Sequence, residues 1–290
     1  MRTCAILALP LLLALGATTA CAPVDEETTT AADPTPTSAE QCSGEDLPVL
    51  EAGTLTIGTD SPAFEPWFQD NDPTNGKGYE SAVAYAVAEE LGFTEDQVSW
   101  VKVPFNSSYK PGAKDFDFDI NQISITPDRA EVVDFSDGYY QASQAVIALD
   151  DSPIADATTV AGLADYNLGA QTGTTSLTTI RDVIGPTTEP AVFEDTSAAK
   201  QALLNGQVDG ILADLPTAFY ITAVEIPQAT LIGQFQPALD QQEEFGMLFE
   251  KGSELVPCVN EALATLRDDG TLEAIEQEWL SDVVDVPELQ

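Results

Sequence analysis

The chain of 290 residues contains no histidine. Histidine is the most common general base, the usual partner of a nucleophilic serine or cysteine, and the most frequent zinc ligand. Its absence argues against most hydrolase and metalloenzyme classes. We therefore expect no metal site and no cofactor.

Basic residues are scarce as well, since 10 lysines and arginines stand against 49 aspartates and glutamates, which gives a formal net charge of -39. Proteins bind nucleic acids mainly through contacts of lysine and arginine with phosphates. A nucleic-acid partner is therefore excluded. We expect the acidic surface to keep the protein solvated and resistant to aggregation; the alternative is that it steers cationic ligands.

Long apolar runs are missing too, and no stretch of the sequence is long enough to cross a bilayer. Hydrophobic residues nevertheless make up 43% of the chain and charged residues only 20%, a composition that can form a core. A length of 290 residues favours two compact units, because a typical domain has about 150 residues.

The N-terminus has the features of an export signal: Arg2 precedes an apolar stretch over residues 5–17 and small residues at 18–20. The small residues end directly at Cys21 and resemble the bacterial lipobox, whose cysteine is acylated and becomes the mature N-terminus. The resemblance implies a signal peptide over residues 1–20 and a lipid anchor on the extracellular face of the cell membrane. The alternative is an ordinary secreted protein in which Cys21 is incidental.

Residues 21–46 are rich in Thr, Ala, Pro and Glu and cannot bury enough apolar surface to fold, so they predict a flexible stalk. Exported proteins meet an oxidising compartment in which cysteines pair. With Cys4 in the signal peptide and Cys21 acylated, only Cys42 and Cys258 remain. We predict a disulfide between these two cysteines.

From Gly53 onward, strand patterns alternate with helical patterns, which is typical of α/β units around largely parallel sheets. The strands and alternating stretches are expected at residues 54–59, 98–103, 116–125, 144–149, 168–171, 191–194, 209–213, 230–232 and 245–249. The helices are expected at residues 79–91, 174–184, 196–204, 216–224, 253–267 and 271–280. Two α/β lobes follow, formed by residues 47–149 with 241–290 and by residues 150–240. The chain would cross between them near residues 149–153 and 238–246.

Polar residues just after the strands are informative, because ligands of open α/β sheets bind beyond the carboxyl ends of the strands. Such residues are Asp60, Arg129, Thr174, Thr175 and Asp214. A guanidinium can hold a carboxylate through two hydrogen bonds, helix amides and hydroxyls add anion-binding donors, and an aspartate accepts an ammonium group. Together they predict a site for a zwitterion. Taken singly, each could be a surface ion pair, a helix cap or a turn residue.

Six segments resemble, in order along the chain, the extracellular solute-binding proteins, family 3, of ABC importers for polar amino acids. The segments are IGTDSPAFEPWF (57–68), GYESAVAYAVAEELG (78–92), ISITPDRAEVVDFSDGYY (123–140), GAQTGTT (169–175), VDGILADLP (208–216) and EFGMLFEKGSELVPCVN (244–260). The resemblance implies a type II periplasmic binding protein, in which two α/β lobes are joined by two hinge strands and close on a ligand.

The resemblance also implies which residues form the ligand site. Arg129 corresponds to the carboxylate-binding arginine of the family and Asp214 to its ammonium-binding acid. Hydroxyl and amide groups are assigned to Ser124, Thr174 and Thr175. The side-chain end of the pocket is assigned to Asp60, Phe64, Phe105, Asn121 and Gln122, and we expect Trp67 to line it as well.

The side-chain preference stays open between a basic and an amide side chain. The acidic Asp60 and the acidic surface favour either of these over an acidic side chain. Asn121 and Gln122, however, stand where binders of basic amino acids usually carry small residues.

The leading hypothesis is a lipid-anchored, monomeric substrate-binding subunit that captures an L-amino acid and delivers it to a permease and its ATPase, with no chemistry of its own. One alternative is an amino-acid sensor for a receptor or kinase. A second is an enzyme on the same fold, resembling the cyclohexadienyl dehydratases, with Asp60, Glu65 or Asp214 as general acid or base. The chain shows no pair of nucleophile and base, which disfavours the enzyme.

Overall fold

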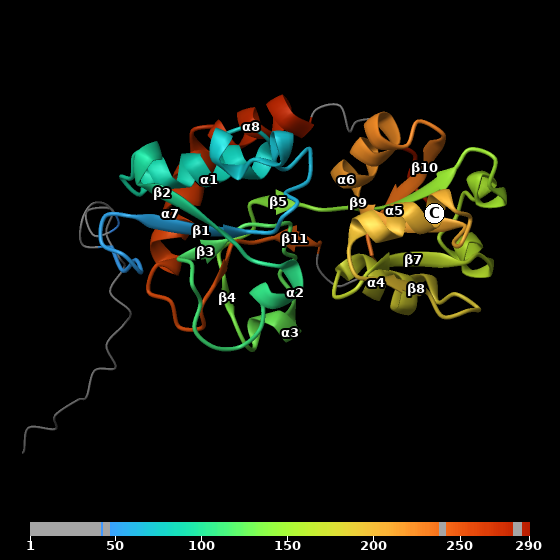
Figure 1. Cartoon of the computed structure of the whole chain (residues 1–290), viewed down its shortest axis with the longest axis horizontal. Coiled ribbons are helices and arrows are strands. Elements are labelled where there is room, and N and C mark those ends of the chain that lie inside the picture. Colours follow the sequence, from blue (N-terminus) through green and yellow to red (C-terminus); the bar gives the residue numbers. More distant parts are fainter. Residues whose placement is uncertain (1–41, 43–46, 238–241, 281–285) are drawn as a thin grey trace, which may run out of the picture. The chain divides into compact units, whose positions relative to one another are not determined.

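The computed structural model describes residue 42 and residues 47–237, 242–280 and 286–290 (Figure 1). The predicted signal peptide, Cys21 and most of the predicted stalk lie outside the described residues. The described part contains two five-stranded sheets and one two-stranded sheet. None of its helices is long and apolar enough to span a membrane.

The first lobe is built on a sheet with the strand order β2-β1-β3-β12-β4. Its strands are β1 (Leu55–Thr59), β2 (Val98–Lys102), β3 (Phe118–Asp119), β4 (Asp134–Phe135) and β12 (Leu248–Phe249). β1 pairs in parallel with β2 and β3, whereas β12 runs antiparallel to β3 and β4. Leu55 and Ile57 of β1 are fully buried, as the alternation of the sequence predicts.

Helices cover this sheet and follow its strands. The longer ones, α1 (Tyr79–Glu90), α7 (Val256–Asp268) and α8 (Thr271–Leu280), contact one another and share a core with β1 (Figure 1). Two short helices are α2 (Phe105–Ser108) and α3 (Pro127–Ala130). Thr126 caps α3, because its hydroxyl accepts a hydrogen bond from the Arg129 amide at 3.3 Å.

The second lobe has a sheet with the strand order β10-β6-β9-β7-β8. Its strands are β6 (Gln144–Leu149), β7 (Leu168–Gln171), β8 (Ala191–Phe193), β9 (Gly210–Asp214) and β10 (Ala229–Phe235). Its helices are α4 (Thr175–Thr179), α5 (Thr196–Leu204) and α6 (Leu215–Tyr220). π-helical turns at Ile180–Ile184 and Ile221–Glu225 extend α4 and α6 over the predicted lengths. Short 3₁₀ helices lie at Gln69–Asn71, Pro73–Asn75, Glu95–Gln97, Pro153–Asp156 and Ala161–Asp165.

Two hinge strands, β5 (Tyr140–Gln141) and β11 (Glu244–Phe245), join the lobes as an antiparallel pair. The predicted disulfide is present: Cys42 and Cys258 are bonded, with their Cα atoms 5.0 Å apart. It attaches the chain before the first strand to the first turns of α7, where Cys258 belongs to the core of the first lobe.

The position of the first crossing differs from the prediction. β6 pairs antiparallel with β9 and β10, so residues 144–149 belong to the second lobe and the chain crosses before Gln144, not at residues 149–153. Alternation along a strand identifies the strand but does not say which sheet it joins.

The end of the chain also differs from the prediction, because residues 286–290 return to the second lobe. The amide of Gln234 in β10 donates to the Pro287 carbonyl at 2.8 Å, and Leu289 is 7% exposed in the core of that lobe. A Cβ atom on Gly233 would lie 2.7 Å from Leu289 Cγ, so the absence of a side chain at this position makes room for the tail.

Two expected strands are shorter than predicted. Residues 245–249 form parts of two strands, β11 and β12, which meet different partners. Within residues 116–125 only β3 is a strand, because Gln122 has a φ of 49° and its amide donates to the Glu80 carboxylate instead of to a neighbouring strand.

Candidate ligand-binding site

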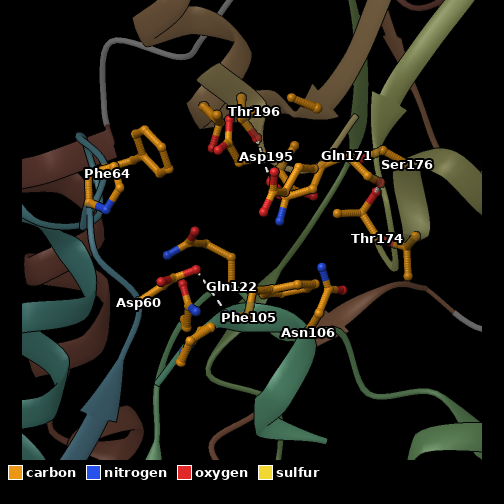
Figure 2. A pocket seen from close by; sticks show the side chains of 18 of the residues that line it. Asp60, Phe64, Phe105, Asn106, Gln122, Gln171, Thr174, Ser176, Asp195 and Thr196 are labelled. Carbon is orange, nitrogen blue, oxygen red and sulfur yellow. Dashed lines mark hydrogen bonds between the residues drawn. The ribbon is translucent and has the colours of Figure 1, made fainter. Parts of the chain in front are cut away.

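A cavity of about 380 Å³ is lined by residues of both lobes (Figure 2). Its lining includes every predicted site residue except Arg129 and Trp67. From the first lobe the lining includes Asp60, Phe64, Phe105, Asn121, Gln122 and Ser124; from the second lobe it includes Thr174, Thr175 and Asp214. The sequence therefore placed these residues in one site, although Asp60 and Asp214 lie more than 150 positions apart along the chain.

Arg129 lies beside the cavity and not in its lining. Its guanidinium donates to the Ser124 carbonyl at 2.7 Å and to the Gly173 carbonyl at 2.8 Å. The ring centroid of Tyr109 is 4.9 Å from the guanidinium carbon, and Arg129 is 8% exposed. Arg129 thus joins a first-lobe loop to the turn that precedes α4 in the second lobe.

The turn before α4 is fitted closely against the first lobe. Gly173 has a φ of 76°, and a Cβ atom there would lie 2.2 Å from Asn106 Oδ1. The Thr174 hydroxyl donates to the Gln171 carbonyl at 2.8 Å and accepts the Leu177 amide at 3.2 Å, so it serves as a helix cap.

The Thr175 hydroxyl faces the first lobe instead. Its Oγ1 lies 3.2 Å from Ser124 Oγ, and both residues line the cavity. Thr175 therefore presents its hydroxyl in the cavity, whereas the Thr174 hydroxyl is engaged by the backbone of its own turn.

Asp214 ends β9 and precedes α6. Its carboxylate accepts a hydrogen bond from Gln144 Nε2 at 3.2 Å. Removal from water and the nearby Glu243 carboxylate raise the pKa of Asp214 well above its usual value, and the Gln144 hydrogen bond opposes this effect only in part. An ammonium group at this carboxylate would offset both unfavourable effects.

Asp60 fixes the start of α2. Its Oδ2 accepts the Phe105 amide at 3.0 Å and its Oδ1 accepts the Ser61 amide at 2.6 Å. The Phe105 ring then lies along the cavity (Figure 2). Asp60 therefore positions this ring in addition to lining the cavity itself.

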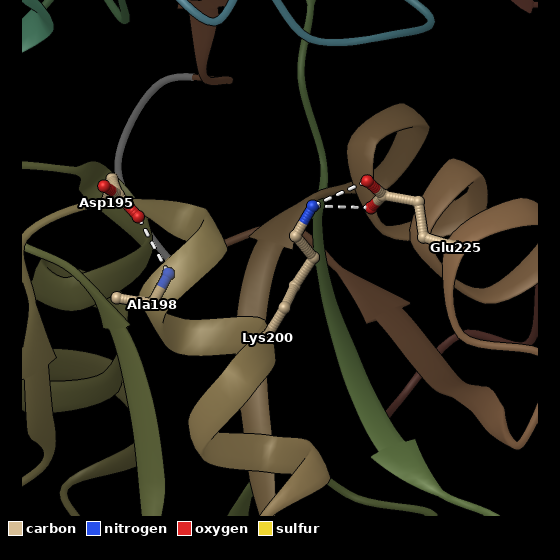
Figure 3. Close-up of polar contacts among 4 residues, drawn as sticks. All are labelled: Asp195, Ala198, Lys200 and Glu225. Carbon is tan, nitrogen blue, oxygen red and sulfur yellow. Dashed lines mark hydrogen bonds and ion pairs between the residues drawn. The ribbon is translucent and has the colours of Figure 1, made fainter.

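Phe64 and Trp67 contact the second lobe in different ways. Lys200 Nζ lies 5.3 Å from the Phe64 ring centroid and pairs with Glu225 at 2.7 Å (Figure 3). Trp67 is fully buried and donates from Nε1 to Thr217 Oγ1 at 2.8 Å. The prediction that Trp67 lines the pocket is wrong, because its indole lies in the first-lobe core.

Glu80 holds Gln122 in its left-handed conformation. The fully buried Glu80 carboxylate accepts the Gln122 amide at 2.6 Å and the Gln122 side-chain amide, and it also accepts the Tyr139 hydroxyl. Burial raises the pKa of Glu80 to about 7 in spite of these hydrogen bonds. The side-chain nitrogen Nδ2 of Asn121, the residue before Gln122, has no hydrogen-bond partner among the described residues, so it can donate to a ligand.

The analysis of the sequence missed several residues of the site. Glu194, Asp195 and Thr196 line the cavity from the end of β8 and the start of α5 (Figure 2). Asp195 and Thr196 follow a predicted strand and Glu194 ends it, so the rule that selected Asp60 could have found them. Asp195 also caps α5 by accepting the Ala198 amide at 2.8 Å (Figure 3).

Glu243 was missed for a different reason. It lies just outside the cavity lining, directly before β11, and its carboxylate accepts the Ser124 hydroxyl at 2.7 Å and Gln144 Nε2 at 3.0 Å. These contacts depend on the pairing of two hinge strands that are far apart in the sequence, and no local pattern marks the residue.

Comparison with known proteins agrees with this geometry. The model of the bacterial extracellular solute-binding proteins, family 3, matches residues 55–282. The chain belongs to this family. As a family 3 solute-binding protein it has the type II periplasmic fold that the sequence predicted, and the α/β fold class is confirmed.

Its relatives in this family bind different amino acids. The L-cystine-binding protein TcyA of Bacillus subtilis (strain 168) is 29% identical over 241 residues, covering 81% of this chain and 84% of TcyA. The ABC transporter glutamine-binding protein GlnH of the same organism is 28% identical over 222 residues, covering 73% and 76%. The arginine-, lysine-, histidine-binding protein ArtJ from Geobacillus stearothermophilus superposes with a TM-score of 0.66 at 27% identity, covering 79% of this chain and 95% of ArtJ.

Proposed function

We propose that this family 3 protein is the substrate-binding subunit of an ABC importer and captures an L-amino acid with a basic or amide side chain. The protein works as a monomer, is anchored to the extracellular face of the membrane through Cys21, and passes its ligand to a permease and ATPase without chemical change. The observation that carries the proposal is that Asp214, Ser124 and Thr175, from the two lobes, line the same cavity beside Arg129.

The carboxylate end of the ligand is assigned to Arg129 and Thr175. A guanidinium has five N–H donors, and two hydrogen bonds of Arg129 go to backbone carbonyls. The remaining donors can hold a carboxylate, which also favours the positive charge of this buried group. The Thr175 hydroxyl, which lies 3.2 Å from Ser124 Oγ, adds a donor from the second lobe when it turns from Ser124 to the ligand.

The ammonium end is assigned to Asp214. A half-buried carboxylate with a raised pKa gains most from a cationic partner that removes it from an unfavourable environment. Ser124 Oγ donates its proton to Glu243, so its lone pairs are available to a donor such as an ammonium group.

The side-chain end is acidic and aromatic. Asp60, Glu194 and Asp195 line the cavity, and among the described residues Lys102 is the only basic one in its lining. The rings of Phe64 and Phe105 offer faces to a cation. An acidic side chain would be repelled here, whereas a basic side chain is attracted and an amide can be hydrogen-bonded.

The experiment is a thermal-shift screen of residues 41–290 against the twenty L-amino acids, ornithine, citrulline and cystine. A ligand at 100 times its Kd adds about 2.7 kcal/mol, which is roughly 5 to 10 °C for a protein of this size. We expect shifts for basic or amide amino acids and none for aspartate and glutamate. A shift for cystine alone would overturn the proposed side-chain class. A flat panel with folded protein would overturn amino-acid binding.

The same samples test whether the protein acts as an enzyme. Each ligand that gives a shift is incubated with the protein and recovered for mass spectrometry. We expect it to be recovered unchanged, and conversion of the ligand would favour the dehydratase-like alternative.

A further inference from the structure

One carboxylate of the hinge contacts groups of both lobes. Glu243 is 7% exposed, and its Oε1 accepts the Ser124 hydroxyl at 2.7 Å while its Oε2 accepts Gln144 Nε2 at 3.0 Å. Ser124 belongs to the cavity wall of the first lobe, and Gln144 begins β6 of the second. The hinge thus supplies a polar connection between the two halves of the site.

Gln144 shares its amide nitrogen between two carboxylates. Its Nε2 donates to Asp214 at 3.2 Å and to Glu243 at 3.0 Å, and the residue is fully buried. Its Oε1 has no hydrogen-bond partner within the described ranges. Both acids need the NH₂ side of this amide, so together they fix its orientation. The charge of Glu243 disfavours the negative charge of Asp214.

We propose that Glu243 is a positioning residue that orients Ser124 and Gln144 and couples capture of the ligand's ammonium group to release of a proton from the neighbouring Asp214. The inference rests on the proposed function, because it assigns the ammonium group to Asp214. When the ammonium group arrives, it replaces the proton on the Asp214 carboxyl. The proton leaves to solvent, so the Asp214 carboxylate with its bound ammonium group has the same net charge as the protonated carboxyl had.

The proton release requires that Asp214 be partly protonated before the ligand binds. Burial and Glu243 raise the pKa of Asp214, as does Glu80 of α1. The charge of Asp214 in turn acts on the guanidinium of Arg129 in α3 and on the phenol of Tyr140 in β5. A group with a raised pKa loses its charge as the pH falls through that pKa. Affinity for an ammonium ligand should therefore weaken toward acid pH.

The test compares Glu243→Gln with the wild type by calorimetry. L-arginine, L-glutamine and L-cystine serve as probes between pH 5.5 and 8.0, in pairs of buffers with different ionisation enthalpies. For the wild type we expect proton release on binding and an affinity that decreases as the pH is lowered. Loss of the Glu243 charge lowers the pKa of Asp214, so in Glu243→Gln the fall in affinity should begin at least about one pH unit lower.

Glu244→Gln is the matched control, because Glu244 is the next residue of the hinge segment and does not line the cavity. It should retain the wild-type pH profile. Gln144→Met should shift the profile in the opposite direction. It removes the hydrogen bond that lowers the pKa of Asp214, so on acidification the affinity should begin to decrease at a higher pH than in the wild type. A Glu243→Gln profile that coincides with the wild-type profile would overturn the proposal.

A measurement without ligand separates this proposal from the proposed function. The side-chain carboxyl of Asp214 can be titrated by NMR in full-length protein with ¹³C-labelled aspartate, and Asp214→Asn assigns its signal. Glu243→Gln should shift this titration to lower pH and Gln144→Met to higher pH. If none of the three probes binds the wild type, the proposed function fails for them, and the titration alone decides the role of Glu243. Unshifted titrations in both variants refute that role.

Discussion

Arg129 contacts both lobes and is also the residue proposed to hold the ligand's carboxylate. Its guanidinium bonds to the Ser124 carbonyl of the first lobe and the Gly173 carbonyl of the second, and aromatic rings lie beside it. Loss of affinity after its substitution would therefore not by itself prove a contact with the ligand. A ligand that lacks the carboxylate separates the two effects.

We expect Arg129→Lys to lower the affinity for the amino acid selected by the screen about 100-fold, because a lysine cannot form the two parallel hydrogen bonds of a guanidinium. The α-carboxamide of the same amino acid should bind the wild type weakly, and its affinity should fall less than about tenfold in the variant. Calorimetry of both ligands with both proteins gives the interaction energy. Equal losses for the acid and its carboxamide would show that Arg129 does not hold the carboxylate.

At the residue scale, four of the five polar residues that were selected after predicted strands line the cavity, and the fifth, Arg129, lies beside it. Asp60 and Asp214 were identified in this way, and both line the cavity. Glu243 could not be identified, because its role depends on Ser124 and Gln144, which the fold brings to it from other parts of the chain. Sequence shows a chemical group at a strand end, but not a contact made across a hinge.

At the scale of elements, the lengths of helices and strands were predicted better than their partners. The helix predicted over residues 79–91 is α1, and the strand over residues 144–149 is β6. The sheet to which β6 belongs could not be read from alternation, since the same pattern fits either lobe. The return of residues 286–290 to β10 was missed because a short tail has no periodicity of its own.

The tail should stabilise the second lobe. Leu289 fills space beside Gly233 and belongs to the core of that lobe, so Leu289→Ala should lower the free energy of unfolding by about 2 to 4 kcal/mol. Leu50→Ala is the control, because Leu50 is 59% exposed and its truncation should cost less than about 0.5 kcal/mol. Urea unfolding measures both. Equal stability of the two variants would mean that the tail contributes little to this lobe.

At the scale of the whole molecule, an acidic chain with 10 basic residues uses one of its few arginines beside the cavity. The two lobes meet there through Arg129, through Ser124 with Thr175, and through Trp67 with Thr217. Each contact joins the lobes next to the cavity. This arrangement fits a protein whose ligand is held between two lobes, as family 3 membership indicates.

The central claim is that an L-amino acid binds in this cavity with its ammonium group on Asp214. The most direct measurement is calorimetry of the amino acid selected by the screen, with the wild type and with Asp214→Asn at pH 7.5. The variant keeps the shape of the side chain and removes its charge. The account predicts a loss of affinity of at least about 100-fold, or roughly 2.7 kcal/mol. An unchanged Kd would contradict it.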